Sequence, residues 1–277
     1  MIVAGVDIGG TFTDLMLYDT ESGEVVVHKV RSTPGEPERA MIDGLDELCR
    51  QARRRPDEVD AVYHGTTVAT NAIIERKGAR TGLITTRGFR DVLELRRIRI
   101  PKLYDLEWEK PEPLVPRYLR VEVDERMTHK GEVFKKINED SVRDAMAILT
   151  RHGVESVAVS LINAYANPAH EQAVREVLRE VSPDLHVTLS SDVLPEMREY
   201  ERTSTAVINA YVMPVMKRYV ASLEGGLRKA GFGVPLLLMQ SNGGTMSAEL
   251  ACETPMHVVE SGPAAGVIAA HHLARKA

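Results

Sequence analysis

The stretch VDIGGTFTD, from Val6 to Asp14, decides the fold class of this chain. It places an acid at the end of an apolar segment, followed by two glycines, two threonines and a second acid. Gly9 and Gly10 let the backbone turn with unusual dihedral angles and approach a ligand closely, and the surrounding N–H groups and hydroxyls suit a phosphate tail. The alternative is a plain hairpin turn whose acids and threonines satisfy nearby N–H groups.

The polar residues of this stretch have candidate roles. Asp7, at the carboxyl end of the expected strand, is the candidate ligand of Mg²⁺, because this ion prefers oxygen ligands and keeps several waters. Asp14 is expected to do likewise or to orient a water, so both acids are candidate catalytic residues. The predicted nucleotide-binding residues of the turn are Gly9, Gly10, Thr11 and Thr13.

The order of elements around the turn indicates an α/β fold. The motifs GxxxxGK[ST] and GxGxxG do not fit, because here the glycines join two strands, expected over residues 2–8 and 15–18. A third strand over residues 24–30 completes an antiparallel meander. A helix over 36–54, a strand over 60–63 and a helix over 67–77 follow, so the chain opens as a βββαβα unit with a mixed sheet.

The rest of the chain continues the α/β alternation around one irregular segment. We expect an irregular β insertion over about 96–137, and then alternating helices and strands over 139–189, which favour a doubly wound core. A long helix over 200–229, broken or bent near Pro214, a strand over 235–240 and a helix after Gly262 complete the chain. The domains predicted from this pattern are residues 1–194 and, as the truncated beginning of a second such domain, residues 195–277.

These motifs resemble known protein families. A phosphate-binding hairpin after the first strand of a βββαβα unit resembles the actin-like ATPase superfamily of sugar kinases and heat-shock chaperones, with ribonuclease H-like domains that close over ATP. Four further stretches are similar to the hydantoinase A and 5-oxoprolinase family, over almost the whole chain. They are YHGTTVATNAIIERKGARTGLITTRGFRDVLEL (63–95), LPEMREYERTSTAVINAYVMP (194–214), QSNGG (240–244) and ESGPAAG (260–266).

The resemblance implies ATP-dependent opening of a cyclic amide such as a hydantoin or 5-oxoproline. ATP would phosphorylate the amide oxygen, so that water can attack the ring carbon. In this family a B-type subunit or a C-terminal region commonly carries the hydrolytic metal site, so the resemblance implies a hetero-oligomer. Members normally continue into a second phosphate motif, and this chain is therefore expected to be a fragment that is inactive alone. Two alternatives stay open: an acetone or acetophenone carboxylase-type subunit that phosphorylates a ketone enolate, and an ATP-responsive assembly module without chemistry.

A second candidate region begins at the end of the strand over 60–63. His64 is a candidate catalytic residue that polarises a substrate carbonyl, and the alternative is a structural histidine bonded to a loop carbonyl. Thr66 and Thr67 are able to cap the next helix, whose N-terminal N–H groups suit an oxygen or phosphate. Asn71 lies one turn into that helix. These three residues are the candidate substrate-binding set, with capping alone as the alternative for the threonines.

The stretch SNGGTMS, residues 241–247, repeats the glycine pair after another apolar strand. Ser241 and Ala248 stand at the positions of the two acids, so no metal role is expected. Asn242, Gly243 and Gly244 are the predicted nucleotide-binding residues of this turn, through backbone N–H groups at an interdomain cleft, and a plain loop is the alternative. The small residues of SGPAAG allow either close approach of a ligand or tight helix packing.

Composition excludes several classes of partner. The 277 residues carry a formal charge of -5, with a pI near 6.0, whereas nucleic-acid binding requires a concentrated basic surface. No window approaches the roughly 20 apolar residues that span a bilayer. The two cysteines suggest a reducing cytoplasm rather than a disulfide framework. A cluster formed by Arg90, Arg96, Arg97 and Arg99 either recognises an acidic substrate or partner or lies on a solvated face.

Overall fold

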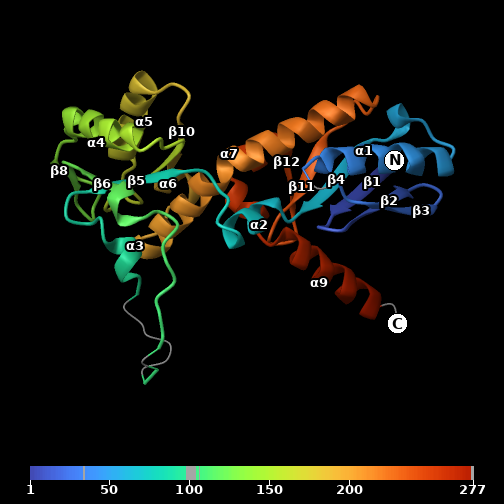
Figure 1. Ribbon diagram of the computed structural model, residues 1–277, viewed down its shortest axis with the longest axis horizontal. Helices are drawn as coiled ribbons and strands as arrows, with labels where there is room; N and C mark the ends of the chain where they lie inside the picture. Colours follow the sequence, from blue (N-terminus) through green and yellow to red (C-terminus); the bar gives the residue numbers. More distant parts are fainter. Residues whose placement is uncertain (34, 98–103, 106, 276–277) are drawn as a thin grey trace. The chain divides into compact units, whose positions relative to one another are not determined.

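The computed structural model describes residues 1–33, 35–97, 104, 105 and 107–275. They divide into two compact units: unit 1 is formed by Met1–Glu75 and Val215–Ala277, and unit 2 by Arg76–Pro214. Unit 2 is thus inserted into the chain of unit 1 (Figure 1). The boundary expected between residues 194 and 195 lies inside unit 2, and the division into two ATPase-like domains stays a prediction.

Unit 1 contains a six-stranded mixed sheet in the order β12-β11-β4-β1-β2-β3. Its strands are β1 (Ile2–Ile8), β2 (Phe12–Asp19), β3 (Val25–Arg31), β4 (Ala61–Thr66), β11 (Leu236–Met239) and β12 (Thr245–Ser247). β1, β2 and β3 form the expected antiparallel meander, and β4 and β11 run parallel to β1. With the helices α1 (Pro37–Gln51) and α2 (Val68–Ile74), the βββαβα opening of an actin-like, ribonuclease H-like domain is confirmed. The strand expected over 235–240 extends this first sheet instead of opening another.

α1 covers one face of the meander. Its apolar residues Met41, Leu45 and Leu48 recur at helical spacing and are fully buried. The helix can approach β2 closely because Gly44 has no side chain: a Cβ there would lie 2.6 Å from Cδ1 of Leu15. Side chains alternate along a strand, so the neighbours of Leu15 point to the opposite face of the sheet.

The remaining helices of unit 1 come from the end of the chain. α7 (Glu199–Lys229) passes through Pro214 as one helix and is not broken there, and its residues from Val215 onward belong to unit 1. α8 (Ala248–Glu253), the 3-10 helix η3 (Pro255–Val258) and α9 (Ser261–Ala274) follow β12. A further 3-10 turn, η1 (Pro56–Glu58), connects α1 to β4.

Unit 2 contains a four-stranded parallel sheet in the order β10-β9-β5-β6. Its elements are β5 (Thr81–Thr86), α3 (Val92–Leu95), η2 (Arg117–Leu119), β6 (Arg120–Val123), α4 (Glu139–Arg151), β9 (Ser156–Ser160), α5 (Ala169–Val181), β10 (His186–Leu189) and α6 (Ser190–Val193). β5 and β9 are buried along their whole length, as expected of a parallel sheet covered on both faces. β7 (Arg126–Met127) and β8 (Val133–Lys135) form a small hairpin inside the expected insertion, of which residues 98–103, including Arg99, and 106 lie outside the described residues.

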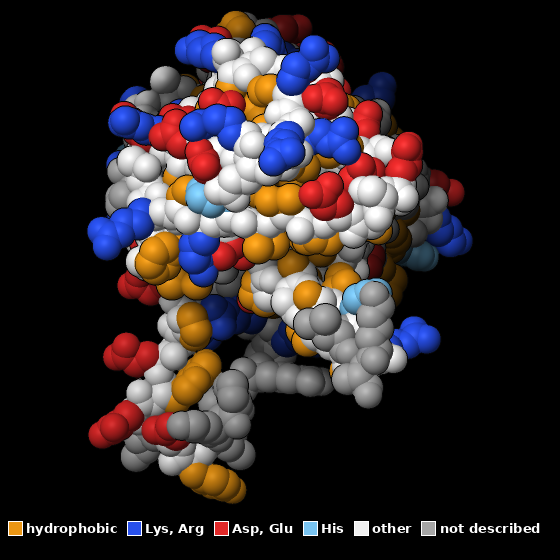
Figure 2. All heavy atoms as spheres, turned by 90° about the vertical axis from the view of Figure 1, so that its right-hand side faces the viewer, with side chains coloured by type: hydrophobic (Ala, Val, Ile, Leu, Met, Phe, Trp, Pro, Cys, Tyr) orange, Lys and Arg blue, Asp and Glu red, His pale blue; other side chains and the backbone are white. Residues whose placement is uncertain are grey.

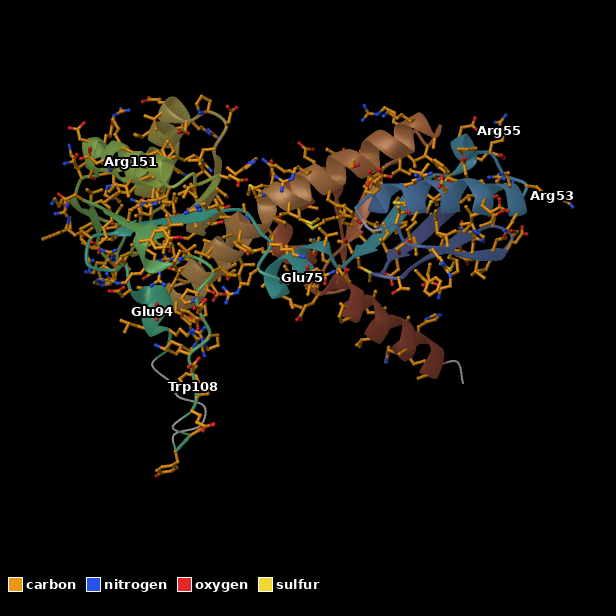
Figure 3. The ribbon with its side chains drawn as sticks, in the orientation of Figure 1. Arg53, Arg55, Glu75, Glu94, Trp108 and Arg151 are labelled. Atoms are coloured by element: carbon orange, nitrogen blue, oxygen red, sulfur yellow. The ribbon has the colours of Figure 1, made fainter. Side chains whose placement is uncertain are left out.

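Charged side chains are dispersed over the surface. Arg53 and Arg55 project from the segment that follows α1 (Figure 3). On the face of the molecule shown in Figure 2, acidic and basic side chains are intermingled, with apolar side chains between them. Within the described ranges, no helix is both long and apolar enough to cross a bilayer.

The packing of α1 on β2 is testable with a pair of glycine substitutions. Gly44→Ala raises helix propensity by about 1 kcal/mol but inserts a methyl group against the buried Leu15, and such overpacking costs about 1–3 kcal/mol. We expect a net loss of stability in urea unfolding of the chain. Gly225→Ala in α7 is the matched control: its Cβ meets no atom within 4 Å, so it gains about 0.5–1 kcal/mol. If Gly44→Ala is as stable as Gly225→Ala, the close packing of α1 against Leu15 of β2 is contradicted.

Candidate functional site

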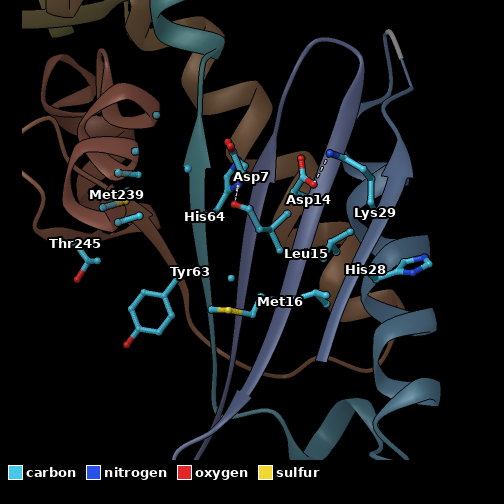
Figure 4. Close-up of a pocket in the computed structure, with 18 residues that line it drawn as sticks. Asp7, Asp14, Leu15, Met16, His28, Lys29, Tyr63, His64, Met239 and Thr245 are labelled. Atoms are coloured by element: carbon cyan, nitrogen blue, oxygen red, sulfur yellow. Dashed lines mark hydrogen bonds and ion pairs between the residues drawn. The ribbon is translucent and has the colours of Figure 1, made fainter. Parts of the chain in front are cut away.

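A cavity of about 880 Å³ lies in unit 1 between the sheet face opposite α1 and the helix α9 (Figure 4). Its charged lining comes from Asp7, Asp14 and Lys29. Met16, Val27, Tyr63 and Met239 supply apolar lining from four different strands. The cavity therefore combines a polar end, which suits phosphates, with an apolar floor, which suits a flat or apolar ligand group.

The polar end is a row of residues that crosses four strands. Asp7 pairs with Gly65 of β4 on one side and with Asp14 of β2 on the other, and Asp14 pairs with Lys29 of β3. The Nζ of Lys29 lies 2.8 Å from Oδ1 of Asp14, and Figure 4 shows the two side chains pointing toward each other. Lys29 is a site residue that the sequence analysis missed, although the register of a tight meander places it opposite Asp14.

Two carboxylates that face each other across a strand pair repel. The side chain of Asp7 reaches solvent, but the surrounding sheet desolvates it in part, and this raises its pKa; the charge of Asp14 raises it further. A divalent cation would relieve the repulsion, and two carboxylates are a suitable protein contribution for Mg²⁺, which completes its shell with waters and phosphate oxygens. Among the described residues, no group of three or more His, Cys, Asp or Glu side chains is placed to hold a metal by itself.

The turn between β1 and β2 is closed by hydrogen bonds. The N–H of Gly9 donates to the carbonyl of Phe12 at 3.0 Å, and the hydroxyl of Ser32 donates to the carbonyl of Gly9 at 2.7 Å. Thr13 is buried and bonded to Ser32, 3.0 Å between the hydroxyl oxygens, so its side chain lies in the core and not in the cavity. Thr11 is exposed on the turn.

The two glycines of this turn, Gly9 and Gly10, do not adopt left-handed φ angles. Gly10 leaves open space beside the backbone of the turn, because a Cβ there would meet no atom within 4 Å. The turn therefore presents uncovered backbone, as phosphate binding requires.

The second glycine turn is also a hairpin, between β11 and β12. Since β1, β4 and β11 are parallel, their carboxyl ends, with the turns that follow them, lie along one edge of the sheet. The side chain of Asn242 accepts from the N–H of Gly244 at 2.8 Å. Gly243 has φ +86°, and a Cβ there would lie 2.3 Å from Cδ1 of Ile268 in α9, so glycine is needed both for conformation and for packing.

His64 is buried in the core, on the strand face opposite the carboxylate of Asp7. Its Nδ1 lies 3.1 Å from the carbonyl oxygen of Val6 and its Nε2 lies 2.6 Å from the hydroxyl of Tyr219. A carbonyl only accepts, so Nδ1 carries the proton and Nε2 accepts from Tyr219. Burial lowers the pKa of His64 to about 4, which keeps the ring neutral. Both nitrogens are engaged, as the structural alternative requires, and the catalytic role of His64 stays a prediction.

The candidate substrate-binding residues surround the start of α2. Thr66 is buried and its hydroxyl accepts from the N–H of Val68 at 3.2 Å, while the amide of Asn71 donates to the hydroxyl of Thr67 at 3.2 Å. The hydroxyl of Thr66 thus binds the first N–H of α2, whereas Thr67, the N-cap residue, makes no side-chain capping hydrogen bond. None of the three residues belongs to the lining of the cavity, although they lie at the same sheet edge.

The small residues of α9 face the cavity. Gly262, Ala265, Gly266 and Ala269 all line it. A Cβ at Gly266 would meet no atom within 4 Å, so the absence of a side chain there leaves space instead of allowing helix packing. This arrangement favours close approach of a ligand to the helix backbone.

Two family models match the chain. The model described as Hydantoinase/oxoprolinase N-terminal region matches residues 3–182, and the model described as Hydantoinase/oxoprolinase matches residues 202–277. Together they cover nearly all of unit 1 and most of unit 2.

Two relatives and two solved structures agree with these matches. The caprolactamase subunit alpha of Pseudomonas jessenii is 36% identical over 94% of this chain and 38% of its own length. The acetophenone carboxylase gamma subunit of Aromatoleum aromaticum is 32% identical over 98% of the chain and 39% of its own length. The structure of the ATP-dependent caprolactamase superposes with a TM-score of 0.87 at 35% identity, covering 95% of this chain and 39% of that one. The nucleotide-free structure of acetone carboxylase superposes with a TM-score of 0.88 at 27% identity, covering 99% of this chain and 40% of that one.

The chain therefore spans about two fifths of the length of these relatives. The structural matches extend over both units of the chain, and they confirm the mixed α/β, actin-like type of fold that the sequence predicts.

The buried state of His64 gives a pH-dependent prediction. Its pKa in the folded chain is about 4, below the ordinary value near 6.5, so the unfolded chain binds more protons between these values. Its contribution to stability is present above about pH 6.5 and is lost as the pH falls toward 4. Between pH 7 and pH 5 we expect a loss on the order of 2 kcal/mol from this group in urea unfolding. His64→Gln should lack this component, and an identical pH dependence in both proteins would contradict the assignment.

Proposed function

The chain belongs to the hydantoinase/oxoprolinase family, and we propose that it supplies the nucleotide-binding part of an ATP-dependent enzyme that opens cyclic amides. The observation that carries this proposal is the row of Asp7, Asp14 and Lys29 beside the cavity of unit 1. The caprolactamase relative, at 36% identity, supports a lactam or similar ring as the substrate class.

In this proposal the phosphates of ATP lie against the turn of Gly9, Gly10 and Thr11. The N–H groups of Gly10 and Thr11 bind phosphate oxygens, whereas the N–H of Gly9 is donated to Phe12 and holds the turn closed. Lys29 neutralises part of the phosphate charge. Thr13 acts indirectly, by fixing the turn through Ser32. The turn of Asn242, Gly243 and Gly244 lies on the same sheet edge. The N–H groups of Gly243 and Gly244 are donated to Gln240 and to the side chain of Asn242, so the N–H of Asn242 is the donor proposed for this turn.

Mg²⁺ fits the two facing carboxylates. Asp7 would hold the ion directly or through a water, and Asp14 would hold it or orient a water, while the ion pair with Lys29 holds the Asp14 side chain in place. When bound, the ion would draw charge from the phosphate that is transferred. The proposal assigns no coordination geometry.

The proposed reaction has two stages. The amide oxygen of the ring attacks the terminal phosphorus of ATP, the bond to the bridging oxygen breaks, and ADP leaves. The resulting imidate-like phosphate is a better electrophile than the amide, so a water attacks its ring carbon. The C–N bond of the ring then breaks as a proton passes to the nitrogen, and a second water hydrolyses the acyl phosphate to a carboxylate and inorganic phosphate. Thr66, Thr67 and Asn71 are proposed to orient the ring. His64 is proposed to act on the substrate carbonyl through its strand position; its buried ring makes positioning its main contribution.

Hydrolysis would require further protein. We propose that a B-type subunit or a C-terminal region provides the site for the second stage and that the working enzyme is a hetero-oligomer in the cytoplasm. The relatives named as subunits support assembly, and the two free cysteines, Cys49 and Cys252, are compatible with a reducing compartment. The chain alone should therefore turn over little ATP.

A carboxylase role is the second candidate. The 32% identity to an acetophenone carboxylase subunit favours it, and the same site would then phosphorylate a ketone enolate before carboxylation. The two reactions are separable in the complete assembly, because only the carboxylase fixes labelled bicarbonate when given a ketone, whereas only the amide hydrolase releases an amino acid from a lactam.

Asp7→Asn tests the proposed metal ligand in the complete assembly. The amide keeps the shape of the side chain and removes the repulsion from Asp14, so the fold should be at least as stable as the parent. Substrate-dependent ATP hydrolysis should fall at least about 100-fold, equivalent to about 2.7 kcal/mol of transition-state stabilisation. Asp43→Asn on α1, an exposed acid outside the cavity, is the matched control and should keep full activity. Unchanged turnover in Asp7→Asn would remove this residue from the mechanism.

Lys29→Gln tests the proposed phosphate contact. Loss of an exposed ammonium group should raise the KM for ATP about 3- to 10-fold with a smaller change in kcat, and the effect should shrink at high salt because exposed charges are screened. Steady-state kinetics of the assembly at low and high salt measure this. An unchanged KM would show that Lys29 serves only to pair with Asp14.

A further inference from the structure

A second cavity, of about 710 Å³, lies within unit 2 and shares no lining residue with the cavity of unit 1. Gly88 and Phe89 line it directly after the carboxyl end of β5, and the first residues of α7 line another side. The volume is typical of pockets that hold small molecules.

The cavity occupies a favourable place in the parallel sheet of unit 2. From β5 the chain passes to β6 on one side, and from β6 it returns to β9 on the other side of β5. The direction of strand progression therefore reverses at β5. In open parallel sheets, ligands bind beyond the carboxyl ends of the strands at such a reversal.

Three guanidinium groups line the cavity, from Arg96, Arg97 and Arg198. Arg97 is paired with Glu201, and the only hydrogen bond of the Arg96 side chain found in the described structure goes to the neutral carbonyl of Pro111, at 2.8 Å. For Arg198 the described residues provide neither a hydrogen bond nor an ion pair to the side chain.

The acids of the lining neutralise these two arginines only in part, since Glu201, which is ion-paired with Arg97, also interacts electrostatically with Arg198. Asp91 is held by Arg117 through two hydrogen bonds of 2.9 and 3.0 Å, and these bonds lower its pKa. Glu201 is occupied by Arg97. Glu199 is the remaining lining acid. Its single negative charge is smaller than the combined positive charge of Arg96 and Arg198, so these three lining residues together carry a net positive charge.

A buried arginine lies one helical turn along α7 from the cavity lining. The carbonyl of Arg198 accepts from the N–H of Arg202 at 3.1 Å. The Nη2 of Arg202 donates to Leu161 at 2.8 Å, and within the described residues its Nε and Nη1 have no hydrogen-bond partner. Its charge is partly offset by Glu171, by Glu199 and by the ring of Tyr165, and Arg202 itself is not a lining residue.

The backbone of Arg96 is also unusual. Its φ of 54° and ψ of -135° at the end of α3 fall in a region that favours glycine, and a residue held there costs about 1–3 kcal/mol. Arginine at position 96 therefore places a side chain at the cavity but costs stability relative to glycine.

The other lining groups are apolar or aromatic. Phe89, Val92, Leu95 and Tyr200 form walls between the arginines. The planar fork of a guanidinium matches a carboxylate in two parallel hydrogen bonds. We propose that this cavity is a binding site for a small molecule that carries a carboxylate on an apolar body, with Arg96 and Arg198 as its anion-binding residues. The proposal concerns unit 2 alone and does not depend on the nucleotide site.

Titration calorimetry of the whole chain with sodium hexanoate tests the proposal. The parent should bind with a Kd on the order of 1 mM, since a ligand of this size makes few contacts. Arg198→Gln and Arg96→Gly should each weaken binding at least 5-fold. Arg151→Gln, at the end of α4 and outside the cavity, is the matched control and should bind like the parent (Figure 3).

Arg96→Gly distinguishes a binding role from a structural one. Glycine adopts the observed dihedral angles without strain, so this variant should melt at a higher temperature than the parent while it binds hexanoate less tightly. A structural arginine would lose stability instead, and that result would overturn its assignment.

Three further results would overturn the proposal: no hexanoate binding by the parent, equal binding of neutral hexanamide, or tighter binding of inorganic phosphate than of hexanoate. Asp7→Asn should leave hexanoate binding unchanged. Failure at this site is therefore distinguishable from failure of the proposed nucleotide site.

Discussion

The register of β1 against β2 is the constraint on which the candidate site depends. It sets Asp7 opposite Asp14 on one face of the sheet and, in the same strands, turns Val6 and Leu15 toward the core. A slip of one residue would exchange the two faces and bury unpaired carboxylates, at a cost of several kcal/mol. The hydrophobic pattern of the meander therefore enforces a pair of like charges that the sheet alone would disfavour. A site that retains such a pair is suited to a ligand that brings positive charge, and a hydrated divalent cation on a phosphate tail does so.

The core beneath the site holds that register in place. His64 bridges the carbonyl of Val6 in β1 and the hydroxyl of Tyr219 in α7, so one neutral ring connects two strands and a helix behind the carboxylates. Ser32 plays the corresponding part at the turn, where it binds both Thr13 and Gly9. Ser32 does not line the cavity, whereas His64 belongs to its lining although the ring is buried and bonded to Val6 and Tyr219. Each of the two residues is bonded to a segment of the site. Their removal would act on the site through strand position.

Local patterns were sufficient to predict most elements, and long-range pairing was not. The meander, α1, α4, α5 and β10 follow from period and turn residues, which are properties of neighbouring positions. The pairing of β11 with β4 joins strands separated by the whole of unit 2, and no local pattern encodes it, so the sequence alone places the strand over 235–240 in another sheet. The burial of His64 had a usable signal: it shares a strand face with the buried Val62, and period-two alternation places both in the core. The position of Lys29 in the site could likewise be predicted, because the register of a tight meander places it opposite Asp14.

The insertion of unit 2 explains how one chain can carry two separate sites at the carboxyl edges of two sheets. The entry and exit of unit 2 are joined within the unit itself: the N–H of Ala79 donates to the carbonyl of Tyr211 at 2.9 Å. Gly78 packs so closely on the ring of Tyr211 that a Cβ would lie 2.1 Å from it. Because the two ends of unit 2 are held together within that unit, the strands before and after it can pair with each other. These strands, β4 and β11, are neighbours in the sheet of unit 1. Side chains that line the cavity of unit 2 can therefore vary with little effect on the register that holds Asp7 and Asp14.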